Sequence, residues 1–407
     1  MKMKWISFLI LMFLISGFTF AGQKQQIVIG ALFSITGNWS TLGHTSTVAA
    51  EIATEDVNSY FNRVGLDLEV RVIVKDTKLD PKLALTRLQE LAKEGVQIVV
   101  GPQSSAEIAA IRDYADQNGI LILSQSSTAG SLSLPNDHVF RFCPDDKLEG
   151  EAIAALMHAD GIRSIAPIWR NDAGNAGLEA STRIHFTNSG GNVSSGVEYA
   201  AETKNFSSQI QALESQVQAA LADRGQNTTE VGVYLAGFDE VVSILKLAGR
   251  SNTLSSVRWY GSDGVALSQA LLDDSEAAQF ASIANYPNPL PGLPSEASIV
   301  WKPIVKRIEK ETGIAPEAFA LGIYDAIQIA ARTVALRPQE KTSQFVKQHI
   351  AEVASKYFGA TGWTILNKNG DRRFGTFYFM AIRNVKGTLQ WIRTGTYDTA
   401  SKLLERD

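Results

Sequence analysis

Residues 96–128, VQIVVGPQSSAEIAAIRDYADQNGILILSQSST, decide the fold of this chain. Two apolar, β-rich runs, Val96–Val100 and Ile120–Leu123, each lead into a cluster of hydroxyl-bearing residues, and a helical pattern separates them. Parallel sheets present polar groups in this way at the carboxyl ends of their strands, where open α/β folds bind ligands. The stretch therefore predicts two parallel strands with a ligand site at their ends.

A helix is predicted to begin directly after the first of these strands. Ser104 and Glu107 have the spacing of a capping box, which starts a helix. The free N–H groups and the positive dipole end of that helix would face whatever lies beside Ser105. Together with the hydroxyl groups of residues 126–128, this arrangement predicts a site for a small anionic or zwitterionic molecule.

Strands and helices alternate along most of the remaining chain. Asp80 followed by Pro81 predicts a helix start, and Asn205 is expected to cap a later helix. The run Asn192–Tyr199 is interpreted as one strand, and the proline-rich run Tyr286–Pro294 as a linker or surface excursion. This rhythm predicts doubly wound parallel sheets, and 407 residues are enough for two domains.

Composition excludes several classes of protein. The chain is 45% hydrophobic and 20% charged, as in a soluble globular protein, and its net charge of −4 argues against nucleic acid as a partner. Cys143 is the only cysteine, so neither an internal disulfide nor a thiolate metal cluster can form. The five histidines are scattered without an H-E-x-x-H pair, and we expect no metal and no cofactor.

The N-terminus predicts export. Lys2 and Lys4 precede a mostly apolar stretch that ends at Thr19-Phe20-Ala21, the pattern of a secretory signal peptide cleaved after Ala21. The stretch is shorter than the roughly 20 residues that a membrane-spanning helix needs. No cysteine lies near the cut, so lipid attachment is not expected there.

Signatures of catalysis are missing. The sequence has no G-x-S-x-G elbow, no Walker A loop and no G-x-G-x-x-G motif. Ser105, His138 and Asp263 could form a triad on paper, but nothing local makes Ser105 a nucleophile, and we expect no enzyme. Asn367–Asp371 distantly resembles a Ca²⁺ loop; it lacks the acidic positions and is interpreted as a hairpin turn.

An ordered set of short markers runs along the chain. It comprises Ile29-Gly30, Thr36-Gly37, Gly43, Asp76, Pro81, Val100-Gly101-Pro102, Ser105, Val139-Phe140-Arg141, Tyr260-Gly261, Gly264, Tyr324-Asp325-Ala326 and Asn369-Gly370-Asp371. In this order and spacing the chain resembles the type I periplasmic solute-binding proteins, in the leucine/isoleucine/valine-binding branch that serves ABC importers. The resemblance covers essentially the whole mature chain.

The resemblance implies an α/β fold of two doubly wound parallel-sheet lobes joined by three hinge crossings, with ligand held between them. The expected divisions are the signal peptide at 1–21, the N-terminal lobe at 24–141 and 287–376, the C-terminal lobe at 144–284 and 379–407, and hinges near 141–144, 284–287 and 376–379.

The resemblance also implies roles for individual residues. Ser105, with Ser126, Ser127 and Thr128, matches the positions that hold the carboxylate of an amino acid. Asp263 matches the acidic residue that pairs with the α-ammonium group. The plain structural alternatives are a simple helix cap at Ser104, an ordinary turn at residues 126–128 and a solvated loop carboxylate at Asp263.

Departures from the family pattern bear on ligand identity. Leu42 stands where an aromatic residue is frequent, with Trp39 three residues earlier, and Gly174 replaces a common tyrosine. Phe238 keeps the stacking face of a frequent tyrosine without its hydroxyl. Arg170 is interpreted as a surface charge. An α-amino acid stays plausible, but no particular one is indicated.

We therefore expect an exported, monomeric binding protein that delivers an amino acid, or a related small carboxylate or amide, to an ABC importer. Two alternatives remain at this point. One is a sensor that passes ligand occupancy to a signalling partner, and the other is an exported hydrolase that uses Ser105.

Overall fold

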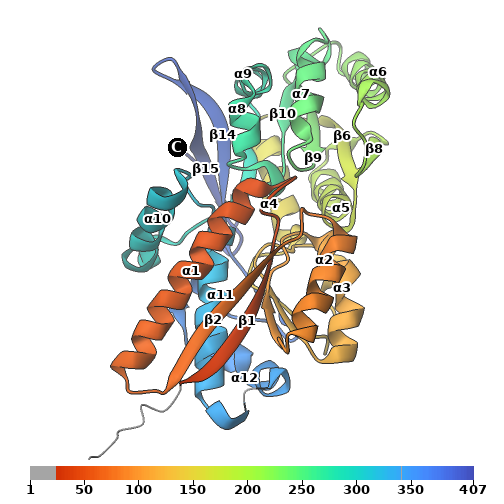
Figure 1. Cartoon of the computed structure of the whole chain (residues 1–407). Coiled ribbons are helices and arrows are strands. Elements are labelled where there is room, and N and C mark those ends of the chain that lie inside the picture. Colours follow the sequence, from red (N-terminus) through yellow and green to blue (C-terminus); the bar gives the residue numbers. More distant parts are fainter. Residues whose placement is uncertain (1–23, 341) are drawn as a thin grey trace, which may run out of the picture.

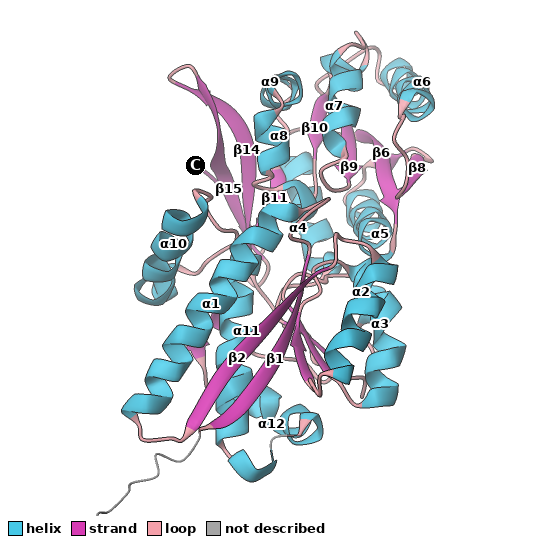
Figure 2. Cartoon of the chain, in the orientation of Figure 1, coloured by secondary structure: helices cyan, strands magenta, loops and turns pink. Residues whose placement is uncertain are grey.

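The computed structural model describes residues 24–340 and 342–407, so the expected signal peptide at 1–21 lies outside the described residues. Two α/β bodies are stacked end to end, each with helices packed on both sides of a central sheet (Figure 1; Figure 2). This is the predicted two-lobed architecture, and the fold-class prediction is confirmed.

The first sheet has the order β2-β1-β3-β4-β5 and is parallel throughout. Its strands are β1 (Gln25–Phe33), β2 (Leu68–Asp76), β3 (Ile98–Val100), β4 (Leu121–Ser124) and β5 (Val139–Arg141). The helices between them are α1 (Ser40–Arg63), α2 (Pro81–Lys93) and α3 (Ser105–Asn118). Because the strands are parallel, the ends of β3 and β4 lie at one edge of the sheet, as predicted.

The second sheet has the order β10-β9-β6-β7, with β8 also paired to β6, and is parallel as well. Its strands are β6 (Ser164–Asn171), β7 (Asn192–Val193), β8 (Val197–Ala200), β9 (Val231–Ala236) and β10 (Arg258–Tyr260). Its helices are α4 (Asp146–Ala159), α5 (Ala173–Asn188), α6 (Ser207–Asp223), α7 (Val241–Gly249), α8 (Gln269–Asp273) and α9 (Ser275–Ile283).

The remaining elements are shared between the two bodies. They are β11 (Asn288–Pro291), α10 (Ser298–Thr312), α11 (Ala318–Ala335), α12 (Ser343–Ser355), β12 (Phe358–Gly359), β13 (Gly362–Trp363), β14 (Thr376–Val385), β15 (Thr388–Asp398) and β16 (Leu403–Arg406). Ile327 of α11 shares a core with Ile29 of β1, whereas Phe379 of β14 shares a core with Ala236 of β9. The chain thus passes between the bodies more than once; the residue boundaries expected for the lobes and hinges stay a prediction.

The predicted helix starts near the first sheet are confirmed. Asp80 caps α2 by accepting from the backbone N–H groups of Lys82 and Leu83, and Pro81 is the first helical residue. Ser104 and Glu107 form a complete capping box at the start of α3. The end of α3 that faces Ser105 is therefore fixed by local chemistry.

Three local predictions need correction. The proline-rich run is not a surface linker, because β11 is a buried strand. It is the edge strand of the sheet β11-β14-β15-β16, and an edge strand tolerates prolines, which have no backbone N–H to donate. The run Asn192–Tyr199 is two strands, separated at Gly196, whose φ of +80° breaks the extended chain. Asn205 is not the N-cap residue of α6, which is Phe206; its side chain instead accepts from the backbone N–H of Ser207, the first residue of the helix.

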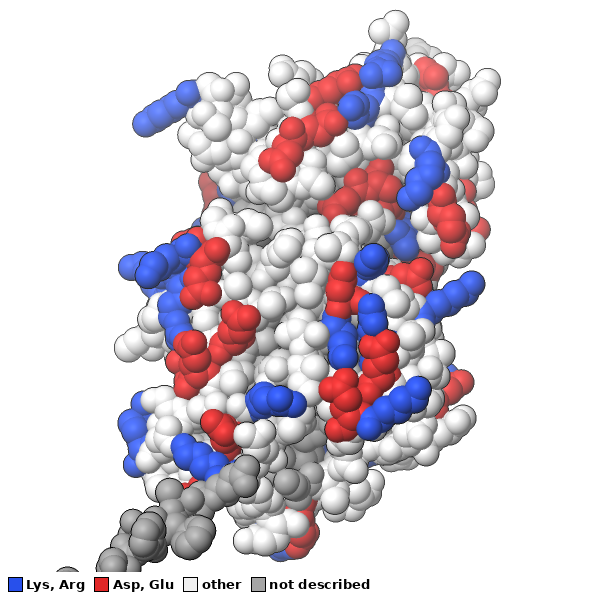
Figure 3. All heavy atoms as spheres, viewed as in Figure 1, with Lys and Arg blue, Asp and Glu red and all other residues white. Residues whose placement is uncertain are grey.

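Charges on the viewed face are mixed. Lysine and arginine are interspersed with aspartate and glutamate there, without a stripe of one sign (Figure 3). Within the described residues, no helix combines the length and apolar character needed to cross a membrane.

A buried ion pair ties the first sheet to the hairpin turn at Asn367–Asp371. Nε of Arg141 lies 2.5 Å from Oδ1 of Asp371, and both side chains are buried. The backbone N–H of Asn367 donates to the carbonyl of Asp371, which confirms the predicted hairpin turn. Nη1 of Arg141 also donates to the carbonyl of Ala129, at 2.6 Å. Strand β5, this turn and the loop after β4 are thereby held together.

Replacing Asp371 by asparagine should lower the free energy of unfolding by about 3–5 kcal/mol, because the Arg141 guanidinium would stay buried without its counter-charge. Urea denaturation measures the loss. Glu352→Gln is the control, since Glu352 forms an exposed pair with Lys356, and it should leave the free energy of unfolding essentially unchanged. Equal losses in the two variants would show that the buried ion pair stabilises the fold no more than the exposed pair does.

Candidate ligand-binding site

One cavity between the two bodies collects most of the residues predicted to bind ligand. Seven of the nine line it: Trp39, Ser105, Ser126, Thr128, Gly174, Phe238 and Asp263. Ser104, Asn175 and Leu178 complete the lining. The first body contributes the residues after β1, β3 and β4, and the second body contributes those after β6, β9 and β10. The cavity therefore lies where the carboxyl ends of two parallel sheets face each other.

Two predicted residues do not line this cavity. The hydroxyl group of Ser127 lies behind it, with its Oγ 3.1 Å from Oγ of Ser105, and its carbonyl accepts from Arg141. The side chain of Leu42 is fully buried in the hydrophobic core of the first body. Ser127 therefore orients a lining residue, and Leu42 supports the wall from within.

Two helix N-termini meet at one side of the cavity. Ser104 and Ser105 begin α3, and Gly174 and Asn175 lie in the first turn of α5. A Cβ atom on Gly174 would come within 3.6 Å of the Ser105 side chain, so this glycine lets α5 approach α3 closely. Helix N-termini offer N–H groups and positive dipole ends, and this side of the cavity suits a carboxylate.

The serine hydroxyls on this side are already oriented. Oγ of Ser105 accepts from the backbone N–H of Ala129 at 3.1 Å, and Ser126 donates to the carbonyl of Gln103 at 2.8 Å. Their positions are therefore set before any ligand arrives. Preorganised groups bind with less loss of conformational freedom than mobile ones.

Three carboxyl groups lie in or beside the cavity, and only Asp263 lines it. Asp263 is 4% exposed, and its backbone N–H donates to Oε1 of the buried Glu149 at 3.1 Å. Burial raises the pKa of Asp263 to about 7. Burial, reinforced by the charge of Asp263, raises the pKa of Glu149, and burial likewise raises the pKa of the neighbouring Asp146. Three carboxyl groups thus share one poorly solvated region.

The apolar end of the cavity is made of aromatic rings from both bodies. Trp39 packs on Phe238 with ring centroids 4.9 Å apart, and Trp39 and Phe319 meet edge to face with ring centroids 6.0 Å apart. Behind this wall, the guanidinium carbon of Arg170 lies 5.3 Å from the centre of the Phe238 ring. This surface fits an aliphatic or aromatic ligand group.

The interpretation of Arg170 as a surface charge is wrong. The side chain is 6% exposed and pairs with Asp172 at 2.8 Å and Glu240 at 3.6 Å. Its guanidinium packs against the Phe238 ring and is held there by the two carboxylates. One of the two carboxylates that pair with Arg170 belongs to Glu240, which is distant in the sequence. The residues next to Arg170 therefore did not predict that its side chain is buried.

The two bodies touch across the mouth of the cavity. The backbone N–H of Trp39 donates to Asp239 at 2.7 Å, and Asn38 donates to Glu240 at 2.8 Å. The space left between the walls is about 10 Å³, roughly one water-sized sphere. The structure is therefore a closed state, and exchange of an amino-acid-sized molecule requires the bodies to move apart.

Some site residues escaped the sequence reasoning. Asn175 and Leu178 follow Gly174 on α5, and Leu178 lies four positions after Gly174 on the same helix face, a spacing that could have revealed it. No local signal marked Glu149 or Asp146 as neighbours of Asp263, since they come from a different element.

The residues imagined as a triad are not brought together. His138 does not line the cavity that holds Ser105 and Asp263; its Nδ1 lies 2.8 Å from Oδ1 of Asp116. Among residues 24–340 and 342–407, no group of histidine, cysteine and acidic side chains has the arrangement of a metal site.

Comparisons with known proteins place the chain in a family. The sequence profile of the periplasmic binding protein family matches residues 26–385. An uncharacterised protein of Methanocaldococcus jannaschii is 28% identical over 401 residues, which cover 94% of this chain and 92% of that protein. A leucine-, isoleucine-, valine-, threonine- and alanine-binding protein of Pseudomonas aeruginosa is 22% identical over 363 residues, covering 88% and 90% of the two chains.

Solved structures agree on the fold. The crystal structure of a leucine-binding protein of Thermotoga maritima matches with a TM-score of 0.73 and 19% identity, over 93% of this chain and 99% of that one. The predicted family is thereby confirmed. The chain belongs to the periplasmic binding protein family, and it is a binding protein rather than an enzyme.

Proposed function

We propose that this protein captures an α-amino acid, or a closely related small zwitterion, between its two lobes and delivers it to an ABC importer. One observation carries the proposal: a single cavity between the lobes is lined by two helix N-termini and by the buried carboxyl group of Asp263. This is the charge pattern complementary to an amino acid. The Leu/Ile/Val-binding names of similar proteins support the same ligand class.

The carboxyl groups favour a cationic ligand group. In the described part of the chain, no lysine, arginine or histidine forms an ion pair with Asp263, Glu149 or Asp146. Neither carboxylate oxygen of Asp146 has a hydrogen-bond partner there, and Oε2 of Glu149 lacks one as well. Buried carboxylates without a counter-charge are unfavourable, and a ligand ammonium group would supply it.

The proposed residue roles follow from these positions. Ser105, Ser126 and Thr128 hold the ligand carboxylate, and Asp263 pairs with its ammonium group. The aromatic wall of Trp39 and Phe238 contacts the ligand side chain. Export through a cleaved signal peptide and docking of the closed monomer on a membrane permease belong to the same proposal.

Replacing Asp263 by alanine should weaken binding of an amino acid by about 2–5 kcal/mol, because the ammonium group would lose its partner in a water-poor site. A thermal-shift screen of the amino acids, their amides and small dicarboxylates first identifies the ligand, since binding to the folded state raises the melting temperature. Calorimetry then compares wild type, Asp263→Ala and the exposed control Asp113→Ala. Unchanged affinity in Asp263→Ala would remove this residue from the site.

Affinity should also depend on pH. In the closed state without ligand, Asp263 holds its proton up to about pH 7, whereas pairing with an ammonium group requires the ionised carboxylate. Binding to this closed state must then release a proton, and affinity for it should rise about tenfold per pH unit between about pH 5 and pH 7 before it levels off.

Calorimetry in buffers with different heats of ionisation measures the released proton directly. Asp263→Asn is the matched variant, since it keeps the shape of the side chain without its titration, and its affinity should change less over this range. A wild-type affinity that stays constant from pH 5 to pH 7 would contradict the assigned pairing.

A further inference from the structure

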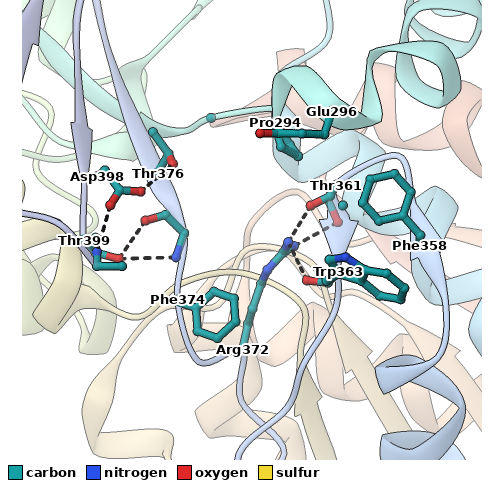
Figure 4. Close-up of a pocket in the computed structure, with 14 residues that line it drawn as sticks. Pro294, Glu296, Phe358, Thr361, Trp363, Arg372, Phe374, Thr376, Asp398 and Thr399 are labelled. Atoms are coloured by element: carbon teal, nitrogen blue, oxygen red, sulfur yellow. Dashed lines mark hydrogen bonds between the residues drawn. The ribbon is translucent and has the colours of Figure 1, made fainter.

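A second, larger cavity lies away from the candidate ligand site and shares no lining residue with it. Its volume is about 400 Å³, within the range of small-molecule sites. The β12–β13 hairpin, the loop before β14, the turn after β15 and the segment after β11 form its walls (Figure 4). All four come from the last third of the chain, where it runs between the two bodies.

Aromatic rings form the walls of this cavity. Trp363 is 50% exposed and Phe374 is 43% exposed, unusually open for side chains of this size. Phe358 meets the ring of Trp363 edge to face, with centroids 5.1 Å apart. Figure 4 shows Phe374 on one side of Arg372 and Trp363 on the other. The walls therefore offer stacking surface for a flat ring.

Arg372 brings a positive charge without a direct ion pair among the described residues; the buried carboxylate of Asp325 interacts with it through Thr361, which hydrogen-bonds both side chains. Its guanidinium donates to the carbonyls of Thr361, Trp363 and Phe142 and to the hydroxyl group of Thr361. No carboxylate of the described residues pairs with it, in contrast to Arg141 at 2.5 Å from Asp371. Its Nε is buried and has no hydrogen-bond partner. A half-buried cation of this kind attracts an anion.

The acidic residues at the rim of the cavity form no ion pair with Arg372. Asp398 already accepts from the backbone N–H groups of Ala400 and Ser401 and from the Ser401 hydroxyl, and these bonds lower its pKa. Glu296 lies across the cavity, next to Pro294 (Figure 4). A ligand whose single negative charge lies near Arg372 is not repelled by Asp398 or Glu296. A second negative charge on the ligand would lie near one of these two carboxylates and be repelled.

A narrow extension continues inward from the cavity. It shares Arg372, Thr361 and Thr376 with the outer cavity, has a volume of about 20 Å³ and is also lined by Gln125. Neither polar atom of the buried Gln125 amide has a hydrogen-bond partner. The extension is large enough for one water molecule, which could join this amide to a polar ligand group.

We propose that this second cavity binds a small aromatic monocarboxylate. The ring lies between Trp363 and Phe374, and the carboxylate faces Arg372 at the entrance of the extension. The aromatic walls, the guanidinium without a direct ion pair and the unpartnered amide each match one part of such a molecule. The site is independent of the amino-acid cleft, so it stands whether or not the proposed function is correct.

The test uses 4-fluorophenylacetate as probe and ¹⁹F NMR as readout, with the full-length mature protein. The neutral 4-fluorophenylacetamide and the cationic 4-fluorobenzylamine are matched probes. Binding of the carboxylate should be saturable and about tenfold tighter than that of the amide, because the amide carries no charge for Arg372. The amine should not bind.

Trp363→Ala should weaken binding of the carboxylate probe by about tenfold or more, because it removes the larger stacking surface while its exposed position leaves folding intact. Ile283→Ala is the control, since Ile283 is 69% exposed and lies outside the cavity; it should leave binding unchanged. Asp263→Ala separates the two sites and should also bind the probe as wild type does.

Three outcomes would overturn the proposal. One is the absence of saturable binding to the wild-type protein at millimolar probe. Another is equal affinity in wild type and Trp363→Ala. The last is binding that is altered in Asp263→Ala but retained in Trp363→Ala, which would place the probe in the amino-acid cleft instead.

Discussion

The ion pair between Arg141 and Asp371 is the constraint on which both sites depend. Through its second contact, Arg141 fixes the carbonyl of Ala129, and with it the adjoining residues Ser126–Thr128 beside the candidate ligand site. Asp371 immediately precedes Arg372, whose guanidinium borders the second cavity. Because a buried pair has little freedom to move, the walls of both cavities are set by one contact between segments 230 residues apart.

Much of the first body could be predicted because its determinants are local. The caps at Asp80 and Ser104 act within three residues, and alternating strands and helices specify a parallel sheet. Once β3 and β4 are parallel neighbours, Ser105 and Ser126 must lie at the same edge. The site residues of the second body could not be predicted from local pattern. Only the resemblance to a family indicated that Asp263, Phe238 and Gly174 lie near Ser105 and Ser126.

The errors at Arg170 and at the proline-rich run share a physical cause, which is burial by a partner distant in the sequence. Arg170 is buried because Glu240 and the Phe238 ring receive its guanidinium. Strand β11 is buried because β14 pairs with it, although its prolines look like a linker. Glu149 became a neighbour of Asp263 only through the packing of α4 beneath the second sheet's loops. Hydrophobic periodicity predicts which face of a helix or strand is apolar, but it does not predict which distant residues pack on the polar face.

Closure of the cleft creates the charge problem that a ligand can resolve. In the closed state, Asp263, Glu149 and Asp146 are held in a region with little water, which is why their pKa values rise. In an open cleft Asp263, which lines it, would be hydrated, and the cost of its ionisation would be small. A ligand ammonium group therefore stabilises the closed state more than the open one, and this difference in affinity shifts the population towards closure. An apolar molecule without a cation would fill the same space but leave the carboxyl groups uncompensated. The acidic side of the cleft thus links recognition of a cationic group to the conformation that a partner would recognise.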